Sequence, residues 1–183
     1  LNLQASAASG HAARAENLLI AFAARRMIDR GEPLRYLSDQ LQLRFANSQP
    51  RAVRTITEFA KSPVTVDALS ARLEALGPEL AGKPRDENLW RTSWRSFSDL
   101  FTVRREASQV VSPQARIERA RVMLRAGRIS KAIEEVERLP GANAATTWIA
   151  DAQRYADVQQ ALDLIETTAM IEPGRLNGNE REA

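Results

Sequence analysis

The chain has 183 residues and a formal net charge of +3, with no cysteine and a single histidine, His11. The absence of cysteine excludes disulfides, thiolate metal sites and cysteine nucleophiles, and one histidine excludes clusters of His ligands. Hydrophobic residues make up 44% and charged residues 27%, as in a globular chain long enough to bury a core. The composition therefore argues against most enzyme chemistries.

Alanine, the strongest helix former, is abundant, whereas glycine and proline number eight each and tyrosine only two. This composition favours helices over sheet. A net charge of +3 is too small to indicate nucleic acid binding. The longest apolar run near the start, residues 18–24, is far short of the ~20 residues that span a bilayer. Because the chain begins at Leu1 without Met, we expect any membrane anchor to lie upstream.

Residues 1–76 are expected to form helical hairpins. The first helix covers about residues 5–30, with Gly31 in the position of a helix C-cap. Thr65 is expected to cap the fourth helix, and Gly77–Pro78 is expected to end it. Apolar residues at helical spacing mark the second, third and fourth helices: Leu34, Leu37, Leu41, Phe45, Val53, Ile56, Ala60, Leu69, Leu73 and Leu76.

Residues 77–85, which hold two glycines and two prolines, are expected to form a linker or hinge. Residues 86–112 follow as an amphipathic helix and a loop. Residues 113–172 are expected to form a C-terminal helical domain that contains the longest helix of the chain, and residues 173–183 a frayed tail. The predicted fold class is all-α, a bundle of packed helical hairpins with a long C-terminal helix.

The segment 86–101 gathers its aromatic side chains on one stripe. At about 100° per residue, four of them fall within an arc of about 60° on an ideal helix. These aromatic residues are Trp90, Trp94, Phe97 and Phe101. Four arginines accompany the stripe, two beside it and two after its C-terminal end: Arg91, Arg95, Arg104 and Arg105.

Three interpretations of this stripe are open. It packs in the core, as most amphipathic helices do. Alternatively, it lies at a membrane surface, where Trp and Phe enter the headgroup boundary and Arg reaches lipid phosphates. A third interpretation stacks single-stranded nucleic acid on the tryptophans. The acidic residues of the segment, Asp86, Glu87 and Asp99, and the modest net charge argue against the third.

The last helix carries a heptad-like stripe that is wider than one short neighbouring helix requires. We expect it to mediate self-association or partner binding through Trp148, Ala152, Tyr155, Gln159 and Leu162.

No residue pattern indicates catalysis. His11 has only glycine and alanine neighbours and is expected to be an ordinary surface residue. Glu134, Glu135 and Glu137 are expected to form a solvated helix face, with ion pairs to Lys131 and Arg138. No glycine-rich phosphate loop, nucleophile elbow or metal-ligand spacing is present. We therefore predict no enzyme activity, no metal and no cofactor.

The C-terminal third resembles the C-terminal domain of the mitofilin family. The matching pieces are Ala-Arg-Val-Met-Leu-Arg-Ala-Gly at 120–127, then Ala132, Leu139 and Gly141, then Thr-Trp-Ile-Ala-Asp-Ala at 147–152, and Gln-Gln-Ala-Leu-Asp at 159–163. Two earlier segments are also similar to those of bacterial relatives. They are residues 23–31 with Pro33, and Val103–Arg105. Gln153 departs from the family, which has Arg after the alanine of the Trp helix.

This resemblance implies a non-enzymatic protein that organises membranes and self-associates. It further implies a bacterial inner-membrane protein with this domain in the periplasm. Its partners would be anionic lipid, further copies of itself and other envelope proteins, and not nucleic acid. The aromatic segment would insert shallowly into one leaflet and favour curvature. The alternative is a soluble helical adaptor or oligomerisation module of an anchored protein, without direct lipid binding.

Overall fold

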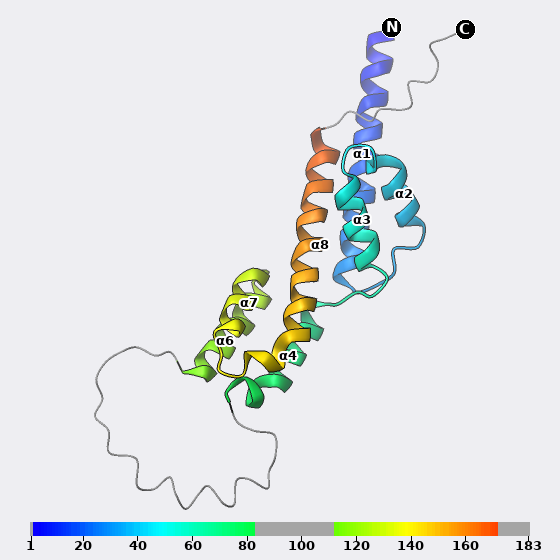
Figure 1. Ribbon diagram of the computed structural model, residues 1–183. Helices are drawn as coiled ribbons and strands as arrows, with labels where there is room; N and C mark the ends of the chain where they lie inside the picture. The colour runs from blue at the N-terminus through cyan, green and yellow to red at the C-terminus, as the bar shows by residue number, and fades with distance from the viewer. Residues whose placement is uncertain (1, 83–111, 172–183) are drawn as a thin grey trace, which may run out of the picture. The chain divides into compact units, whose positions relative to one another are not determined.

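A computed structural model describes residues 2–82 and 112–171 of the chain, with side chains from residue 10 onward (Figure 1). The described residues contain helices and no strand, so the predicted all-α class is confirmed. The predicted aromatic helix, the loop after it up to residue 111, residues 83–85 of the predicted linker and the predicted tail lie outside the described residues.

The described helices follow one another as α1 (Asn2–Asp29), α2 (Tyr36–Phe45), α3 (Pro50–Phe59), α4 (Val66–Leu80), α6 (Pro113–Arg125), α7 (Ile129–Glu137), the 3₁₀ turn η1 (Ala142–Ala145) and α8 (Thr146–Ile171). The predicted long C-terminal helix is confirmed as α8. It is not the longest, however, because α1 has 28 residues and α8 has 26.

The chain divides into two compact units. The first comprises residues 1–65 and 154–183, and the second comprises residues 66–153. The division inside the N-terminal half falls at Thr65 and not at the predicted position 76, because α4 packs against α6. Helix α8 contributes its first turns to the second unit and the rest of its length to the first.

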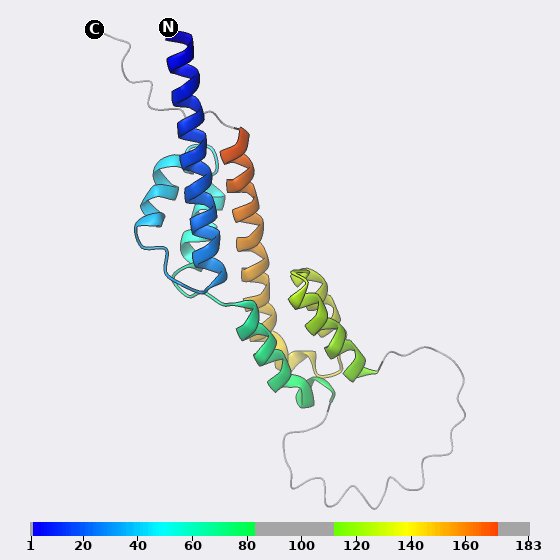
Figure 2. The ribbon, with the colours of Figure 1, turned by 180° about the vertical axis from the view of Figure 1, so that it is seen from behind.

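In the first unit, α2 and α3 and the later part of α8 accompany α1 (Figures 1 and 2). The predicted Gly31 cap of α1 is confirmed. Gly31 has φ 68°, its amide donates to the Ile28 carbonyl at 3.0 Å, and the Glu32 amide donates to the Met27 carbonyl at 2.9 Å. These two bonds satisfy carbonyls that the end of a helix would otherwise leave unpaired.

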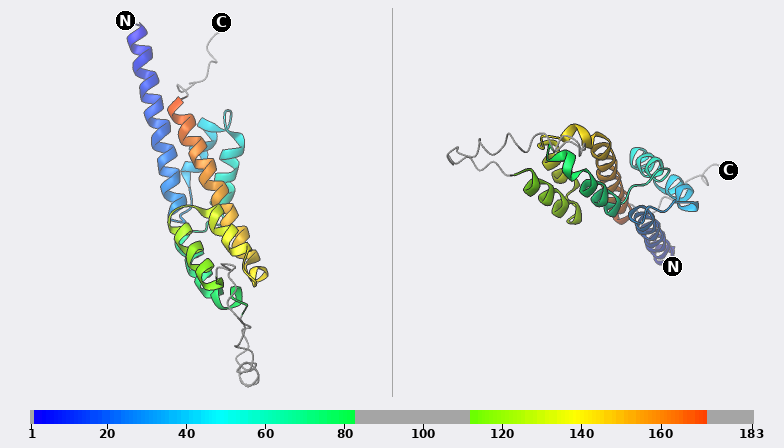
Figure 3. Two further views of the ribbon diagram at one scale, coloured as in Figure 1. Left: turned by 90° about the vertical axis from the view of Figure 1, so that its left-hand side faces the viewer. Right: turned by 90° about the horizontal axis from the view of Figure 1, so that it is seen from below.

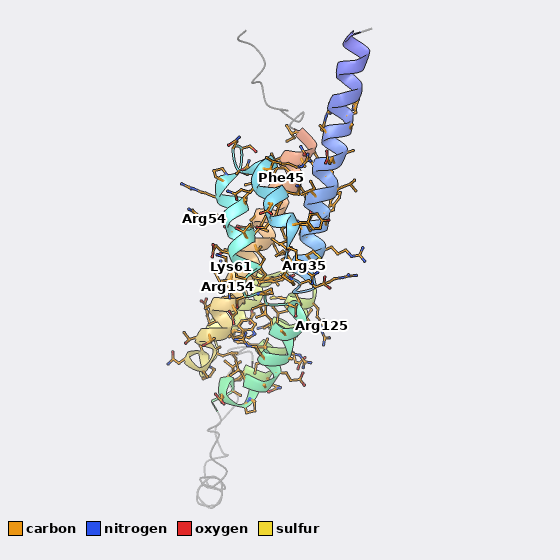
Figure 4. All side chains as sticks on the ribbon, turned by 90° about the vertical axis from the view of Figure 1, so that its right-hand side faces the viewer. Arg35, Phe45, Arg54, Lys61, Arg125 and Arg154 are labelled. Carbon is orange, nitrogen blue, oxygen red and sulfur yellow. The ribbon has the colours of Figure 1, made fainter. Side chains whose placement is uncertain are left out.

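The core of the first unit consists of apolar residues that recur at helical spacing on each of its helices. Most of those predicted for the second and third helices are buried, including Phe45 (Figure 4). The core residues are Ile20, Ala21, Ala24, Ile28, Leu34, Leu37, Leu41, Phe45, Val53, Ile56, Phe59, Val158, Leu162 and Ile165.

One backbone position of the first unit is strained. Arg35, just before α2, has φ 50° and ψ −127°, a combination that residues other than glycine rarely adopt. The residues Leu34 and Leu37 on either side of it are both buried, and the Leu37 amide donates to the Leu34 carbonyl at 3.0 Å. Burial of the two leucines holds this tight turn in place.

The second unit contains α4, α6, α7, η1 and the first turns of α8 (Figure 3). Its core residues are Leu69, Leu73, Leu80, Ile117, Ala120, Leu124, Ile129, Ala132, Ile133, Val136, Leu139, Ala145, Trp148 and Ala152. Helix α6 starts at Pro113, and the Ser112 side chain accepts a hydrogen bond from the Ala115 amide at 3.3 Å. Both features are typical of a helix N-terminus.

The prediction that Gly77–Pro78 ends the fourth helix is wrong. Helix α4 continues to Leu80, and Pro78 lies in its last turn. Leu80, the last residue of α4, is fully buried, and the Ala81 amide donates to the Gly77 carbonyl at 3.0 Å. Burial of Leu80 therefore outweighs the helix hydrogen bond that Pro78 cannot donate.

The end of α4 lies directly against the turn that holds Gly141. The Gly141 amide donates to the Leu80 carbonyl at 3.2 Å. A Cβ atom placed on Gly141 would lie 2.0 Å from the Glu79 carbonyl oxygen and 2.9 Å from the Leu80 Cα. Only a residue without a side chain permits this approach of two backbones.

We therefore expect Gly141→Ala to lower the free energy of unfolding by about 1–3 kcal/mol, because the backbones must separate. Urea denaturation followed by circular dichroism measures this change. The matched control is Gly77→Ala in α4, where an added Cβ meets nothing within 4 Å. Equal stability of Gly141→Ala and Gly77→Ala would contradict the close approach.

Candidate functional site

The residues predicted to bind lipid all lie outside the described residues. They are Trp90, Arg91, Trp94, Arg95, Phe97, Phe101, Arg104 and Arg105. In the sequence they fall between α4 and α6, two helices of the second unit that pack against each other. The predicted self-association stripe on α8 is described throughout.

The stripe begins with Trp148, which is completely buried in the second unit. Its indole Nε1–H donates a hydrogen bond of 2.8 Å to the Leu69 backbone carbonyl of α4. One turn further along α8, Asp151 binds Arg72 of α4 at 2.6 Å. The first turns of α8 are thus fixed to α4 by a buried hydrogen bond and a partly exposed ion pair.

The middle of the stripe is Tyr155, in the first unit. Its ring meets Phe59 edge to face, with ring centroids 6.1 Å apart. Arg154 lies over the same Phe59 ring at 5.4 Å and donates to the Ser62 carbonyl at 2.8 Å, near Lys61 (Figure 4). Burial raises the pKa of Tyr155 to about 12, together with the charge of Asp29 and its hydrogen bond to the phenol.

Gln159 joins a polar network between α1 and α8. The Arg25 guanidinium donates to Gln159 and Asp163 at 2.6 Å each and also to Glu166. The Gln159 amide in turn donates to Asp29 at 2.8 Å. Burial opposes the charged form of Arg25, but its hydrogen bonds to Glu166 and Asp163 outweigh this effect and raise its pKa.

The stripe is therefore part of the chain's own interior. Trp148, Ala152 and Leu162 are fully buried, and Tyr155 is 7% exposed. Helices of the same chain thus cover most of the residues predicted to mediate self-association or partner binding. The physical reason is that helices distant in sequence supply the partners: α4 for Trp148, and α1 and α3 for Tyr155 and Gln159.

The acidic residues of α7 are only partly a solvated face. The expected ion pairs of Glu134 are present, with Lys131 at 2.8 Å and Arg138 at 3.7 Å. Glu135 is instead 8% exposed and binds Arg116 and Arg119 of α6 at 3.0 Å each. Burial alone would raise the pKa of Glu135, but these two arginines lower it below its ordinary value.

Two large apolar side chains of α1 are exposed. Leu19 is 69% and Phe22 is 49% exposed. Their spacing of three residues places them on one face of the helix. The signal in the sequence was that α1 is apolar around its whole circumference near residues 18–24, which is more than one buried face requires.

Among residues 2–82 and 112–171, no three His, Asp or Glu side chains are placed to hold a metal ion. None of the described helices combines the length and hydropathy needed to cross a bilayer. The chain matches no family model, no curated protein and no solved structure. The function proposed below therefore rests on the residues of the chain itself.

We expect the raised pKa of Tyr155 to make stability depend on pH above about 10. An unfolded tyrosine ionises near pH 10, whereas Tyr155 keeps its proton up to about pH 12 when folded. The unfolded state then binds fewer protons, so stability falls with rising pH by up to about 1.4 kcal/mol per unit. Below pH 10 this tyrosine contributes no pH dependence.

Urea denaturation at pH 9, 10 and 11 tests this expectation. Tyr155→Phe should remove the alkaline loss, whereas Tyr36→Phe, at a residue 71% exposed, should retain it. Tyr155→Phe and wild type with the same alkaline slope would contradict the assignment.

Arg25 is expected to be the most sensitive charged residue of α1. Arg25→Ala leaves Glu166 and Gln159 without their donor and should cost about 2 kcal/mol or more. Its sequence neighbour Arg26 is exposed, so Arg26→Ala should stay within about 0.5 kcal/mol of wild type. Thermal or urea unfolding of the two variants in parallel measures the difference. Equal effects would mean that the network contributes nothing to stability.

Proposed function

We propose that this chain is the extramembrane part of a membrane-organising protein of the mitofilin type. Its helical units form a scaffold that self-associates, and the segment 86–105 touches anionic lipid. The protein belongs to a bacterial inner membrane, with this part in the periplasm. It carries out no catalysis and uses no cofactor.

The observation that carries the proposal is the aromatic and arginine stripe in the sequence of the segment 86–105. Leu69, Leu73 and Leu80 of α4 are buried among residues from α6, α7, η1 and α8. Trp148 of that core has its hydrogen-bond partner in α4. In this proposal, the stripe contacts a surface outside the chain.

The resemblance of 120–163 to the mitofilin family supports the same function. Three residues of the segments that resemble the mitofilin family have structural roles in the second unit. Gly127 has φ 71° between α6 and α7, Gly141 lies against the backbone of α4, and Trp148 is buried. The similar residues therefore have structural roles, as the features of a shared scaffold would.

The energetics of shallow insertion are sufficient for weak binding. Full burial of one Phe-sized side chain contributes roughly 1.5–3 kcal/mol. Each arginine at an anionic surface adds about 1 kcal/mol. Partial insertion of two Trp and two Phe with several Arg leaves several kcal/mol, or roughly micromolar to millimolar affinity. Because such sites act strongly only when several are linked, self-association of the scaffold matters to this function.

Co-sedimentation with vesicles that contain phosphatidylglycerol tests the proposal at low salt. We expect the wild-type chain to pellet with them and the Trp94→Ser, Phe97→Ser double variant to stay in the supernatant with a nearly unchanged melting temperature. Arg91→Glu with Arg95→Glu should weaken binding most at low salt, where the attraction is least screened.

The matched control is Tyr36→Ser with Leu43→Ser, which removes two exposed apolar residues of α2 and should leave vesicle binding intact. A wild-type chain that remains in the supernatant would end the lipid proposal. In that case the adaptor or oligomerisation module is the better description. If Phe97→Ala lowers stability by roughly 3–5 kcal/mol, the stripe is core.

A further inference from the structure

Glu135 of α7 lies at the centre of a group of arginine side chains in the second unit. The Nη1 atom of Arg116 and the Nη2 atom of Arg119, both from α6, each donate a hydrogen bond of 3.0 Å to its Oε2 oxygen. Arg138, at the end of α7, places Nη1 3.6 Å from its Oε1 oxygen. Three guanidinium groups therefore surround one carboxylate, and we call them the Glu135 arginine cluster.

The cluster carries more positive than negative charge. Three arginines and one glutamate leave a formal excess of two positive charges. Glu134 does not remove this excess, because it also pairs with Lys131 at 2.8 Å. Elsewhere in the described chain, Arg25 and Arg121 each meet two carboxylates. At Glu135 this balance is reversed.

Glu135 also holds the arginines close together. Because the two donors from α6 lie 3.0 Å from the same oxygen, they are at most about 6 Å apart. The Glu135 side chain is only 11% exposed. The side chains of Arg116, Arg119 and Arg138 are 24%, 42% and 56% exposed, respectively. A buried carboxylate thus orders three guanidinium groups that solvent reaches.

The guanidinium groups keep donors for a second anion. Each has five N–H donors, and the hydrogen bonds to Glu135 use one from Arg116 and one from Arg119. The Nε atom of Arg119 is buried, so the donors that an external group meets are those on its Nη atoms. Because the planar guanidinium is already ordered, little further entropy is lost when it binds an anion.

We propose that the Glu135 arginine cluster binds a phosphate group. Arginine forms paired, charge-assisted hydrogen bonds to phosphate oxygens. A phosphate monoester has three terminal oxygens and up to two negative charges, which match three guanidinium groups and the charge excess of the cluster. A peptide carboxylate has fewer oxygens and a single charge, and Glu135 already provides such a group. The phosphate belongs to a soluble compound or to a lipid headgroup, since both present the same chemistry.

The site consists of described residues of α6 and α7, and it goes beyond the lipid contact proposed for the segment 86–105 without depending on it. Phosphorus-31 NMR of inorganic phosphate titrated with the whole chain, at constant ionic strength in chloride, tests it without a membrane. We expect a dissociation constant of roughly 1 mM or lower for wild type. Arg119→Gln with Arg138→Gln should weaken binding more than about 10-fold, because it removes the two most exposed guanidinium groups.

The matched control is Arg125→Gln with Arg128→Gln. Both arginines are exposed, at the end of α6 and just before α7, and neither is among the arginines that contact Glu135. The control removes the same two charges, and salt screens their more distant influence. Phosphate binding should therefore stay within about twofold of wild type.

Melting temperatures in chloride show whether a variant disturbs the fold. In Arg119→Gln with Arg138→Gln, Arg116 still donates to Glu135, so the buried carboxylate keeps a partner. If this variant nevertheless melts early, Arg138→Gln alone replaces it, because Arg138 is the most exposed of the three arginines. That single change should weaken phosphate binding about threefold or more.

Vesicles distinguish the two sources of phosphate. The background is Trp94→Ser with Phe97→Ser, which removes the lipid contact proposed for the segment 86–105. If the ligand is a lipid headgroup, this chain sediments with vesicles of phosphatidylcholine and phosphatidic acid but not of phosphatidylcholine alone, and the added changes at Arg119 and Arg138 abolish the sedimentation. If the ligand is soluble, the chain binds inorganic phosphate and does not sediment.

Two results would overturn the inference. The first is a chain that neither binds inorganic phosphate nor sediments with phosphatidic acid in that background. The second is binding that the changes at Arg119 and Arg138 weaken no more than those at Arg125 and Arg128, which would reflect net charge alone. Neither result bears on vesicle binding by the segment 86–105, so the two proposals fail separately.

Discussion

The structure depends on one helix whose buried stripe continues through two cores. Helix α8 gives Trp148 and Ala152 to the second unit and Val158, Leu162 and Ile165 to the first, all fully buried. Polar contacts accompany this burial in each unit. Trp148 donates to the Leu69 carbonyl, and Arg25 joins Gln159, Asp163 and Glu166. Each of the two cores therefore includes a part of α8.

The polar contacts of α8 determine how this helix pairs with α1. Gln159 is neither a core residue nor a surface residue, because it accepts from Arg25 and donates to Asp29. A buried donor that loses its acceptor costs more than the bond contributes, so such a network penalises alternative pairings of α1 and α8. The tyrosine beside it is kept neutral by burial and by the Asp29 carboxylate. The network thus selects one register between two helices that are far apart in sequence.

Local features were predictable from the sequence, and contacts between distant segments were not. Helical spacing of apolar residues identified α2, α3 and α4, and Gly31 was recognised as the end of α1. Pro78 misled the assignment of the end of α4, because the burial of Leu80 is a tertiary effect. The stripe on α8 was found, but its partners lie up to 134 residues away, as for Gln159 and Arg25. Periodicity shows that a face is apolar and does not show what covers it.

The packing of Trp148 has an optical consequence. Its indole is shielded from water and its N–H is bonded to a carbonyl, so its emission should lie toward the blue, and soluble quenchers should not reach it. The chain has three tryptophans, and the other two, Trp90 and Trp94, lie in the segment proposed to touch lipid. Quenching by iodide, or by brominated acyl chains within a bilayer, would therefore report on that segment against a constant contribution from Trp148. The unmodified protein carries its own probe of where that segment lies.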